Sequence, residues 1–371
     1  MNILQLINVR WYNACAHYSV TLSYALKRRG HRVLVAGDPK SPPVLEAKKL
    51  GLEVYEDLYL SYTSPWMIVY NIKRIADLVK KENIDIINAH RGEGHLVAVL
   101  YKYFLKKNIP LIRTRGDTRA PTDNIFNRYL NNDLTDQIIV TAETLRRSYL
   151  QDLKIKQDKV SKISVGIDEK FFSPRPPDQR WKNRLNIGEG DLVVGMVGRL
   201  SPVKGHKYFI QAAERVVKKT PRVKFIIAGG DAQIKAAELK ATVKRSNLEE
   251  NFRFVRKIDD IRKIISIFDV GVVASVGSET ICRVALEYMA MGKPVVGTSV
   301  NAIPEVIQHG VNGFVVPPKN GEALGEAIFK LLKDKEKRMD LGGAGRSSVE
   351  KEFSLDQFAK KTEKVYFKFL K

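Results

Sequence analysis

The sequence predicts an α/β protein built from two Rossmann-like domains, each with a doubly wound parallel sheet. The chain has 371 residues, which exceeds the size that one hydrophobic core usually serves. Short apolar runs alternate with helix-length patterns along both halves, as in parallel sheets with helical crossovers. A polar, proline-bearing stretch at 166–191 separates the halves. We therefore expect domains over residues 1–168 and 169–352, followed by a helical segment at 353–371.

In the first half, the strand at 2–7 is followed by a helix at 19–30, which Gly30 ends, and by a second strand at 31–37. Two longer helical patterns cover 66–81 and 94–107. The remaining expected strands are 52–56, 84–90, 109–115, 136–140 and 160–165.

The second half repeats this rhythm after the linker. Its expected strands are 192–198, 223–230, 252–255, 270–275, 294–298 and 312–317, again with helices between them. In open α/β sheets, ligands bind beyond the carboxyl ends of the strands. The functional residues should therefore follow the strands of each half.

Composition gives the chain a strongly basic surface, because 63 Lys and Arg against 41 Asp and Glu leave a formal charge of +22. Such a surface favours nucleic acid, anionic lipid or phosphorylated substrates without choosing among them. Cys15 and Cys282 allow one disulfide but no framework, and no Cys and His spacing is typical of a metal site. Without a signal-peptide pattern or an apolar run long enough to span a bilayer, we expect a cytoplasmic protein.

Two glutamates eight positions apart, Glu279 and Glu287, flank a predicted helix start. If Ser278 or a neighbour caps that helix, they lie about 12 Å apart at 1.5 Å rise per residue. The backbone N–H groups between them attract anions, which suits a ligand with a central diphosphate and hydroxyls at both ends, such as a nucleotide-sugar. The alternative is that both glutamates only decorate an amphipathic helix.

Two glycine-containing loops follow strands of the second half. The first places Arg199 and Lys204 near glycines that allow close backbone approach to a phosphate, although its spacing is not that of a P-loop. The second contains a glycine pair. Their glycines are Gly198, Gly205, Gly229 and Gly230. The alternative is that the two cations are ordinary surface charge.

The densest charge cluster of the first half follows the apolar stretch "IPLI" at 109–112, where Arg113, Arg115 and Arg119 surround Asp117. Three planar guanidinium groups suit an anionic acceptor, and Asp117 is a candidate to orient an acceptor hydroxyl or to take its proton. The alternative is a structural ion pair. His90 and His95 follow another strand and are candidates for the same site, although an isolated histidine is more often structural.

Together, "VGRLSPVKG", "AGG", the E-x7-E pair, "ALEYMAMGKPVVGT" and "IPEVIQHGVNGFVVPP" resemble the family-4 glycosyltransferases of the GT-B fold. The resemblance covers roughly residues 190–320 and implies a cleft between the two domains and a last helix that crosses back to the first. It implies that Glu279 meets the donor sugar and Glu287 the donor ribose. The donor diphosphate is then bound by Arg199, Lys204 and the backbone N–H groups of Ile281 and Cys282.

The chain departs from that family in two places. Thr280, Ile281, Cys282 and Arg283 stand where the family usually has glycines after its first glutamate, and the glycine-rich first loop is replaced by "NVRWYNACAHYS". Donor sugar and acceptor are therefore not carried over from the resemblance.

The leading hypothesis is a retaining, metal-independent hexosyl- or heptosyl-type glycosyltransferase that needs no cofactor beyond its nucleotide-sugar substrate. Its expected acceptor is an anionic cell-envelope glycan or glycolipid, such as lipopolysaccharide core, with peripheral contact to the inner face of an anionic membrane. The alternatives are a nucleotide-sugar epimerase of the same fold and a basic nucleic-acid-binding protein, which only the charge supports.

Overall fold

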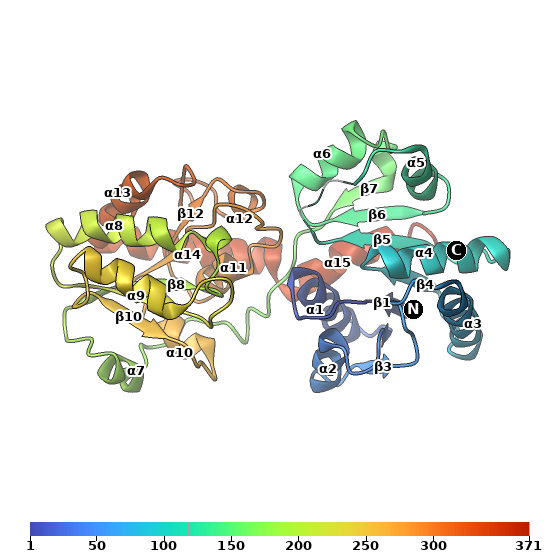
Figure 1. The fold of residues 1–371 in the computed structure, drawn as a ribbon, viewed down its shortest axis with the longest axis horizontal. Helices are drawn as coiled ribbons and strands as arrows, with labels where there is room; N and C mark the ends of the chain where they lie inside the picture. Colours follow the sequence, from blue (N-terminus) through green and yellow to red (C-terminus); the bar gives the residue numbers. More distant parts are fainter. Residues whose placement is uncertain (118, 120, 371) are drawn as a thin grey trace. The chain divides into compact units, whose positions relative to one another are not determined.

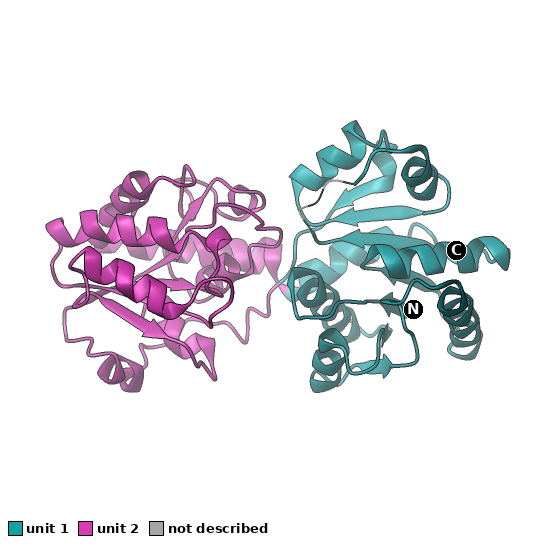
Figure 2. Ribbon diagram, viewed as in Figure 1, with its two compact units in different colours: residues 1–166, 355–371 teal, residues 167–354 magenta. Residues whose placement is uncertain are grey.

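The computed structural model describes residues 1–117, 119 and 121–370 and shows a chain of alternating strands and helices (Figure 1). The chain divides into two compact units (Figure 2). Unit 1 comprises Met1–Gly166 and Leu355–Lys371, and unit 2 comprises Ile167–Ser354. The C-terminal segment thus belongs to the same unit as the N-terminus.

Unit 1 is built on a seven-stranded, fully parallel sheet with the order β3-β2-β1-β4-β5-β6-β7. The strand order reverses between β1 and β4, which is the topological switch point of a doubly wound sheet. The strands are β1 (Asn2–Leu6), β2 (Arg32–Ala36), β3 (Glu53–Tyr55), β4 (Ile86–Ala89), β5 (Leu111–Arg115), β6 (Gln137–Val140) and β7 (Val160–Lys162).

Helices flank this sheet and connect its strands (Figure 1). Helix α3 packs on α4, and α1 packs on both α2 and α15. The helices are α1 (Ala14–Arg28), α2 (Pro42–Lys49), α3 (Pro65–Lys81), α4 (Gly92–Phe104), α5 (Ile125–Asn132), α6 (Glu143–Gln151) and α15 (Leu355–Tyr366), with a 3-10 turn η1 (Gln157–Lys159).

The C-terminal helix α15 is tied to unit 1 by apolar and polar contacts. The rings of Tyr18 and Phe358 meet edge to face, with centroids 4.8 Å apart. The Nδ2 of Asn88, on the buried strand β4, donates to the hydroxyl of Tyr366 at 2.7 Å. The last helix therefore completes the core of the unit in which the chain begins.

Unit 2 contains a six-stranded parallel sheet with the order β10-β9-β8-β11-β12-β13 and a switch point between β8 and β11. Its strands are β8 (Leu192–Val197), β9 (Val223–Ala228), β10 (Phe252–Val255), β11 (Val270–Val273), β12 (Val295–Thr298) and β13 (Phe314–Val316).

Helices α8, α9, α13 and α14 of unit 2 share one large apolar core with its sheet, in which α8 packs closely on α13. The helices of this unit are α7 (Gln179–Arg184), α8 (His206–Lys219), α9 (Ala236–Arg245), α10 (Ile261–Ser266), α11 (Arg283–Ala290), α12 (Ile303–Val306), α13 (Gly321–Leu332) and α14 (Lys335–Ser348), with a 3-10 turn η2 (Pro202–Lys204) and a π-helical turn η3 (Val349–Phe353).

The predicted fold class is confirmed, because each unit is a Rossmann-like parallel sheet flanked by helices. Several element bounds differ from the sequence prediction. The first helix begins at Ala14, earlier than expected, because the side chain of Asn13 caps it by accepting a hydrogen bond from the N–H of Ala16 at 3.1 Å. The expected strand at 160–165 ends at Lys162.

Both cysteines are free and buried, Cys15 in unit 1 and Cys282 in unit 2. Among the helices of the described residues, none combines the length and the apolar character needed to cross a bilayer.

Candidate active site

The loop between β8 and α8 lies on the carboxyl ends of the neighbouring strands. The N–H of Gly198 donates to the carbonyl of Ala228, at the end of β9, and the N–H of Leu200 donates to that of Gly230, both at 2.9 Å. On the other side, the N–H of Val276 donates to the carbonyl of Val203 at 2.8 Å. The loop is therefore anchored at the edge where ligands bind in this class of sheet.

Two glycines are required for this arrangement. Gly205 has φ +75°, and a Cβ there would lie 1.9 Å from the carbonyl oxygen of Ala274. A Cβ at Gly229 would lie 1.9 Å from the carbonyl oxygen of Gly198. Any larger residue at either position would push the loop away from the strand ends. At Gly230 a Cβ would meet no atom within 4 Å, so this position is open.

A short ion pair joins this loop to the first glutamate. The Nζ of Lys204 lies 2.6 Å from Oε2 of Glu279, and the hydroxyl of Ser275 donates to the same oxygen at 2.8 Å. The backbone N–H of Glu279 donates to Oδ1 of Asn301 at 3.3 Å. Glu279 is buried. Residues of the loops after β8 and β11 contact its carboxylate, and Asn301 of the loop after β12 contacts its backbone.

Arg199, the other predicted diphosphate ligand, is exposed. It forms no hydrogen bond or ion pair with any residue that the structure describes. The structure therefore brings Lys204 to Glu279 and leaves the guanidinium group of Arg199 open to solvent and to an anion.

The segment between the two glutamates has an unusual backbone. Ser278 and Cys282 have φ values of +52° and +46°, which non-glycine residues seldom adopt. Helix α11 begins only at Arg283, with Cys282 as its N-cap, so Glu279 lies in the loop before the helix and not in its first turn. The expectation that Ser278 or a close neighbour caps the helix is wrong, because the chain is still in the left-handed conformation at Cys282.

Cys282 occupies a place where the family resemblance has glycine, and it keeps the backbone conformation that glycine favours. Its side chain is fully buried, and that of Ile281 is buried too. The side chain of Cys282, the N-cap residue, forms no capping hydrogen bond with the described start of α11. The backbone N–H groups of this turn thus remain candidates to bind an anion. Lys204, which pairs with Glu279 in the loop before the turn, adds a cation nearby.

Glu287 lies one turn into α11 and is 4% exposed. Its Oε1 lies 3.2 Å from Nε of Arg283, four residues earlier on the same helix. Its Oε2 is buried and has no hydrogen-bond partner among the described residues. Burial raises the pKa of the Glu287 carboxyl, and the charge of Arg283 opposes that rise. A buried oxygen without a partner is a feature that a ligand hydroxyl would satisfy.

In unit 1, the arginine cluster at the end of β5 and in the following loop is largely engaged in contacts with other protein groups. Arg113 is buried and donates from Nη1 to the carbonyl of Ala89 at 3.0 Å, and burial lowers its pKa to about 10. Arg115 donates from Nη2 to Oδ1 of Asp117 at 2.6 Å and from Nη1 to the hydroxyl of Tyr149 at 3.2 Å. The ion pair considered for Asp117 is therefore present.

Arg119 is the exposed member of this cluster. Its carbonyl oxygen accepts a second hydrogen bond from Nη2 of Arg115, at 2.6 Å. Arg115 therefore organises the loop, and Arg119 presents its guanidinium to solvent.

His90 and His95 are both buried in unit 1. The Nε2 of His90 lies 2.7 Å from Oε1 of Gln5, and burial lowers the pKa of His90 to about 3. The Nε2 of His95 lies 2.8 Å from the hydroxyl of Thr135, and burial lowers its pKa well below the usual range. Both imidazoles are thus neutral and packed within the unit, which is the arrangement of structural histidines.

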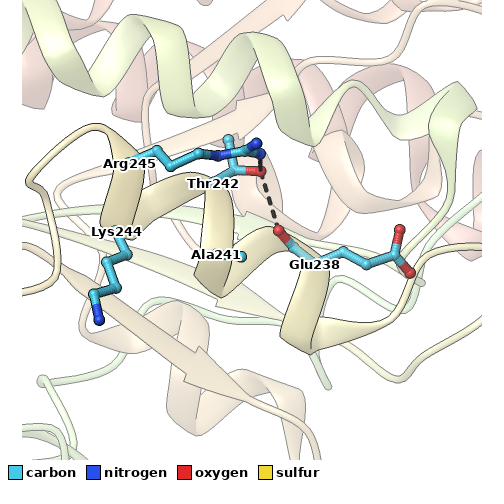
Figure 3. Close-up of a pocket in the computed structure, with 5 residues that line it drawn as sticks. All are labelled: Glu238, Ala241, Thr242, Lys244 and Arg245. Atoms are coloured by element: carbon cyan, nitrogen blue, oxygen red, sulfur yellow. Dashed lines mark hydrogen bonds between the residues drawn. The ribbon is translucent and has the colours of Figure 1, made fainter.

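A surface hollow of about 660 Å³ lies elsewhere in unit 2, along α9 (Figure 3). All its lining residues come from this one helix: Glu238, Ala241, Thr242, Lys244 and Arg245. It reaches the end of α9 that leads to the start of β10, opposite to the carboxyl edge of the sheet. The hollow is therefore separate from the candidate site.

Sequence reasoning missed three residues that position the candidates. Ser275 and Asn301 hold Glu279, and Tyr149 holds Arg115. Ser275 and Asn301 each follow a strand of unit 2, and position after a strand was the signal that could have identified them.

Two Rossmann-like units, one of them with a basic loop paired to a glutamate at its strand ends, have the architecture of the GT-B fold. The chain belongs to the family-4 glycosyltransferases. The family described as "Glycosyl transferases group 1" matches residues 177–348, and "Glycosyltransferase Family 4" matches residues 16–171. Membership favours the transferase over the epimerase and nucleic-acid alternatives.

The chain is also similar to individual proteins, in sequence or in fold. The chain is 25% identical to the N-acetyl-alpha-D-glucosaminyl L-malate synthase of Bacillus anthracis, over 94% of this chain and 92% of the relative. The fold matches that of Anabaena HepE in complex with UDP-glucose, with TM-score 0.81, 21% identity and coverage of 99% and 100%. It also matches a lipopolysaccharide outer core galactosyltransferase, WaaB, with TM-score 0.77, 13% identity and full coverage of both chains.

Proposed function

We propose that this glycosyltransferase transfers a hexosyl- or heptosyl-type sugar, with retention, from a UDP-sugar to an anionic acceptor of the cell envelope. The pairing of Lys204 with Glu279 carries the donor side of the proposal. It places a cation for the diphosphate beside a carboxylate for the sugar, while Arg199 remains open to the same anion. The UDP-glucose complex of HepE, which shares this fold, supports uridine as the base.

A diphosphate held by Lys204, Arg199 and the N–H groups of Ile281 and Cys282 would have its charge neutralised without a metal ion. Glu287, with its open oxygen, would then accept from the ribose hydroxyls. The donor is thus assigned to unit 2.

A thermal-shift screen with UDP, GDP, ADP and CMP tests the donor. UDP at about 100 times its Kd should stabilise the protein by about 2.7 kcal/mol. Lys204→Ala should lose this shift, whereas Lys207→Ala, an exposed lysine three residues further along, should keep it. Equal shifts from all four nucleotides, or an undiminished UDP shift in Lys204→Ala, would contradict the assignment.

The acceptor assignment is supported by the exposed Arg119 and the loop that Arg115 organises. The relative from Bacillus anthracis is named for L-malate, a dicarboxylate, and WaaB is named for lipopolysaccharide. Because Asp117 is held by Arg115, its proposed role is to orient an acceptor hydroxyl. A retaining transfer needs no free inverting base at this position.

Transfer to matched phosphorylated and dephosphorylated acceptors tests this side. The wild type should prefer the phosphorylated acceptor, and Arg119→Ala should lose most of that preference while keeping activity on the neutral one. A wild type that ignores the phosphate would refute the anionic acceptor.

The expected membrane contact is confined to the aromatic side chains that are exposed. Trp66, near the start of α3, is 79% exposed. Tyr103, near the lysine-bearing end of α4, is 58% exposed, whereas Tyr101 is buried in the core. We propose Tyr103, at the basic end of α4, as the aromatic contact of a peripheral, salt-sensitive association with anionic lipid. Co-sedimentation with anionic and neutral vesicles at low and high salt measures it, and equal binding to both would exclude it.

A further inference from the structure

The ion pair between Arg283 and Glu287 includes a residue of the segment in which the sequence departs from the family pattern that it resembles. We propose that Arg283 is a positioning residue for donor binding: it holds one oxygen of Glu287 so that the other faces the two vicinal hydroxyls of the donor ribose. The proposal rests on the ribose contact assigned to Glu287 above and concerns a residue to which no role has been given.

The geometry of the pair supports this role. Arg283 is the first residue of α11, and Glu287 follows it by four residues, a spacing that places two side chains on the same face of a helix. The guanidinium Nε contacts Oε1 of Glu287 at 3.2 Å. The carboxylate therefore has its rotation restrained by a partner on its own helix.

Burial distinguishes this pair from an ordinary surface ion pair. The side chain of Glu287 is 6% exposed, while that of Arg283 is 43% exposed. An exposed i,i+4 pair contributes only a few tenths of a kcal/mol, but a buried carboxylate depends strongly on its partner. Removing the arginine would take away the cation whose charge lowers the pKa of the buried Glu287 carboxyl.

The second carboxylate oxygen of Glu287, Oε2, indicates that the ion pair prepares Glu287 to bind a ligand. Oε2 of Glu287 is buried yet accepts no hydrogen bond from any described residue. Native structures seldom leave a buried carboxylate oxygen unsatisfied, since this costs free energy that a donor would recover. Because Arg283 occupies Oε1, the open Oε2 is the oxygen left for a ligand hydroxyl.

The charge of Arg283 also favours the binding of ribose by Glu287, because it favours the deprotonated carboxylate. Desolvation raises the pKa of Glu287, and Arg283 lowers it. A deprotonated carboxylate accepts from both hydroxyls of a diol, whereas a protonated carboxyl donates at one oxygen. Replacing Arg283 should therefore weaken the recognition of ribose and leave that of the diphosphate unchanged.

Nucleotide binding by calorimetry tests the inference, with UDP and its 2′-deoxy and 3′-deoxy analogues as probes. The wild type should bind UDP about tenfold more tightly than either analogue, as expected for one hydrogen bond to a charged group. Arg283→Leu should weaken UDP binding by about tenfold and weaken the deoxy analogues, which each keep one hydroxyl, by less, so that the discrimination decreases. Arg283→Lys should restore part of it.

The matched control is Arg215→Leu, because Arg215 is an exposed arginine on α8 that pairs with Glu322 at 3.1 Å in the same unit. It should bind all three nucleotides like the wild type. If Arg283→Leu does not fold, as judged by its far-UV circular dichroism, Arg283→Gln provides the same measurement with a smaller change in side-chain polarity.

Two results would overturn the inference while leaving the proposed function intact. Arg283→Leu could discriminate between UDP and its deoxy analogues as well as the wild type does. It could also weaken all three nucleotides equally, which would assign Arg283 to the diphosphate or to the fold. A wild type that binds the three nucleotides equally would instead refute the ribose contact of Glu287, and the inference with it.

Discussion

Replacing Lys204 by alanine should destabilise the protein even when no nucleotide is present. The lysine donates to Oε2 of Glu279 at 2.6 Å, and the side chains of the pair are only 21% and 10% exposed. Without Lys204, the buried carboxylate would keep one side-chain donor, the hydroxyl of Ser275 at 2.8 Å. A buried charge that loses its partner is costly, in contrast to a surface cation.

The magnitude follows from this burial. Breaking a fully buried pair from one side costs about 3–5 kcal/mol. Because the lysine is partly hydrated and Ser275 remains, we expect the lower side of that range or less, about 2 kcal/mol. In a domain of this size that corresponds to a decrease in Tm of about 4–8 °C.

Thermal unfolding followed by circular dichroism measures the effect in Lys204→Ala, Glu279→Gln and the double variant. The double variant should recover part of the lost stability, because glutamine carries no charge that needs a partner, and the coupling free energy should reach about 1 kcal/mol. Lys207→Ala serves as the control, since Lys207 is exposed on α8. The buried ion pair is not a determinant of stability if Lys204→Ala has the same Tm as Lys207→Ala. The same conclusion follows if the losses in free energy of unfolding of the two single variants add up to that of the double variant.

Four further variants test the roles of three site residues and of the buried His90. Arg199→Ala should weaken UDP binding by about tenfold or more with an unchanged Tm, because its side chain is exposed, and an unaltered Kd would contradict its phosphate contact. Glu279→Gln should lower kcat by about 100-fold and change the Kd for UDP little, whereas Glu287→Ala should chiefly raise that Kd; equal effects on both measurements would mean that the two roles are misassigned. His90 has a pKa of about 3 when folded but about 6.5 when unfolded, so protons bind preferentially to the unfolded chain and stability falls as pH decreases from about 6.5 toward 3. His90→Gln should make that fall shallower in urea unfolding at pH 7 and pH 5, and an identical pH dependence would exclude the contribution of His90.

The sequence predicted the fold class and many of the elements because these depend on local patterns. Helix α3 was expected at 66–81 and spans Pro65–Lys81, since its apolar residues recur at helical spacing and a proline opens it. Gly205 and Gly229 were expected to allow close approach of the backbone to a phosphate, which stays a prediction; what the structure shows at both positions is a backbone carbonyl oxygen that leaves no room for a Cβ.

Contacts between distant parts of the sequence could not be predicted in this way. Lys204 and Glu279 are 75 residues apart and meet only because β8 and β11 are neighbours across the switch point. Whether Asp117 was free or ion-paired depended on the side-chain conformation of Arg115, which no sequence pattern determines. The helix start at Arg283 was also missed, because Cys282 adopts a backbone conformation that its residue type does not favour.

That conformation links stability to function in the segment between the two glutamates. Holding Ser278 and Cys282 at positive φ costs about 1 kcal/mol or more at each position, and the surrounding contacts must maintain it. These contacts are the bonds of Glu279: its side chain accepts from Lys204 and its carbonyl accepts from the N–H of Ala302 at 3.0 Å. A donor diphosphate that recruits Lys204 would therefore compete with Glu279 for the same ammonium group. Because the freed carboxylate would then be available to the donor sugar, we expect binding of the diphosphate and engagement of the sugar by Glu279 to be coupled.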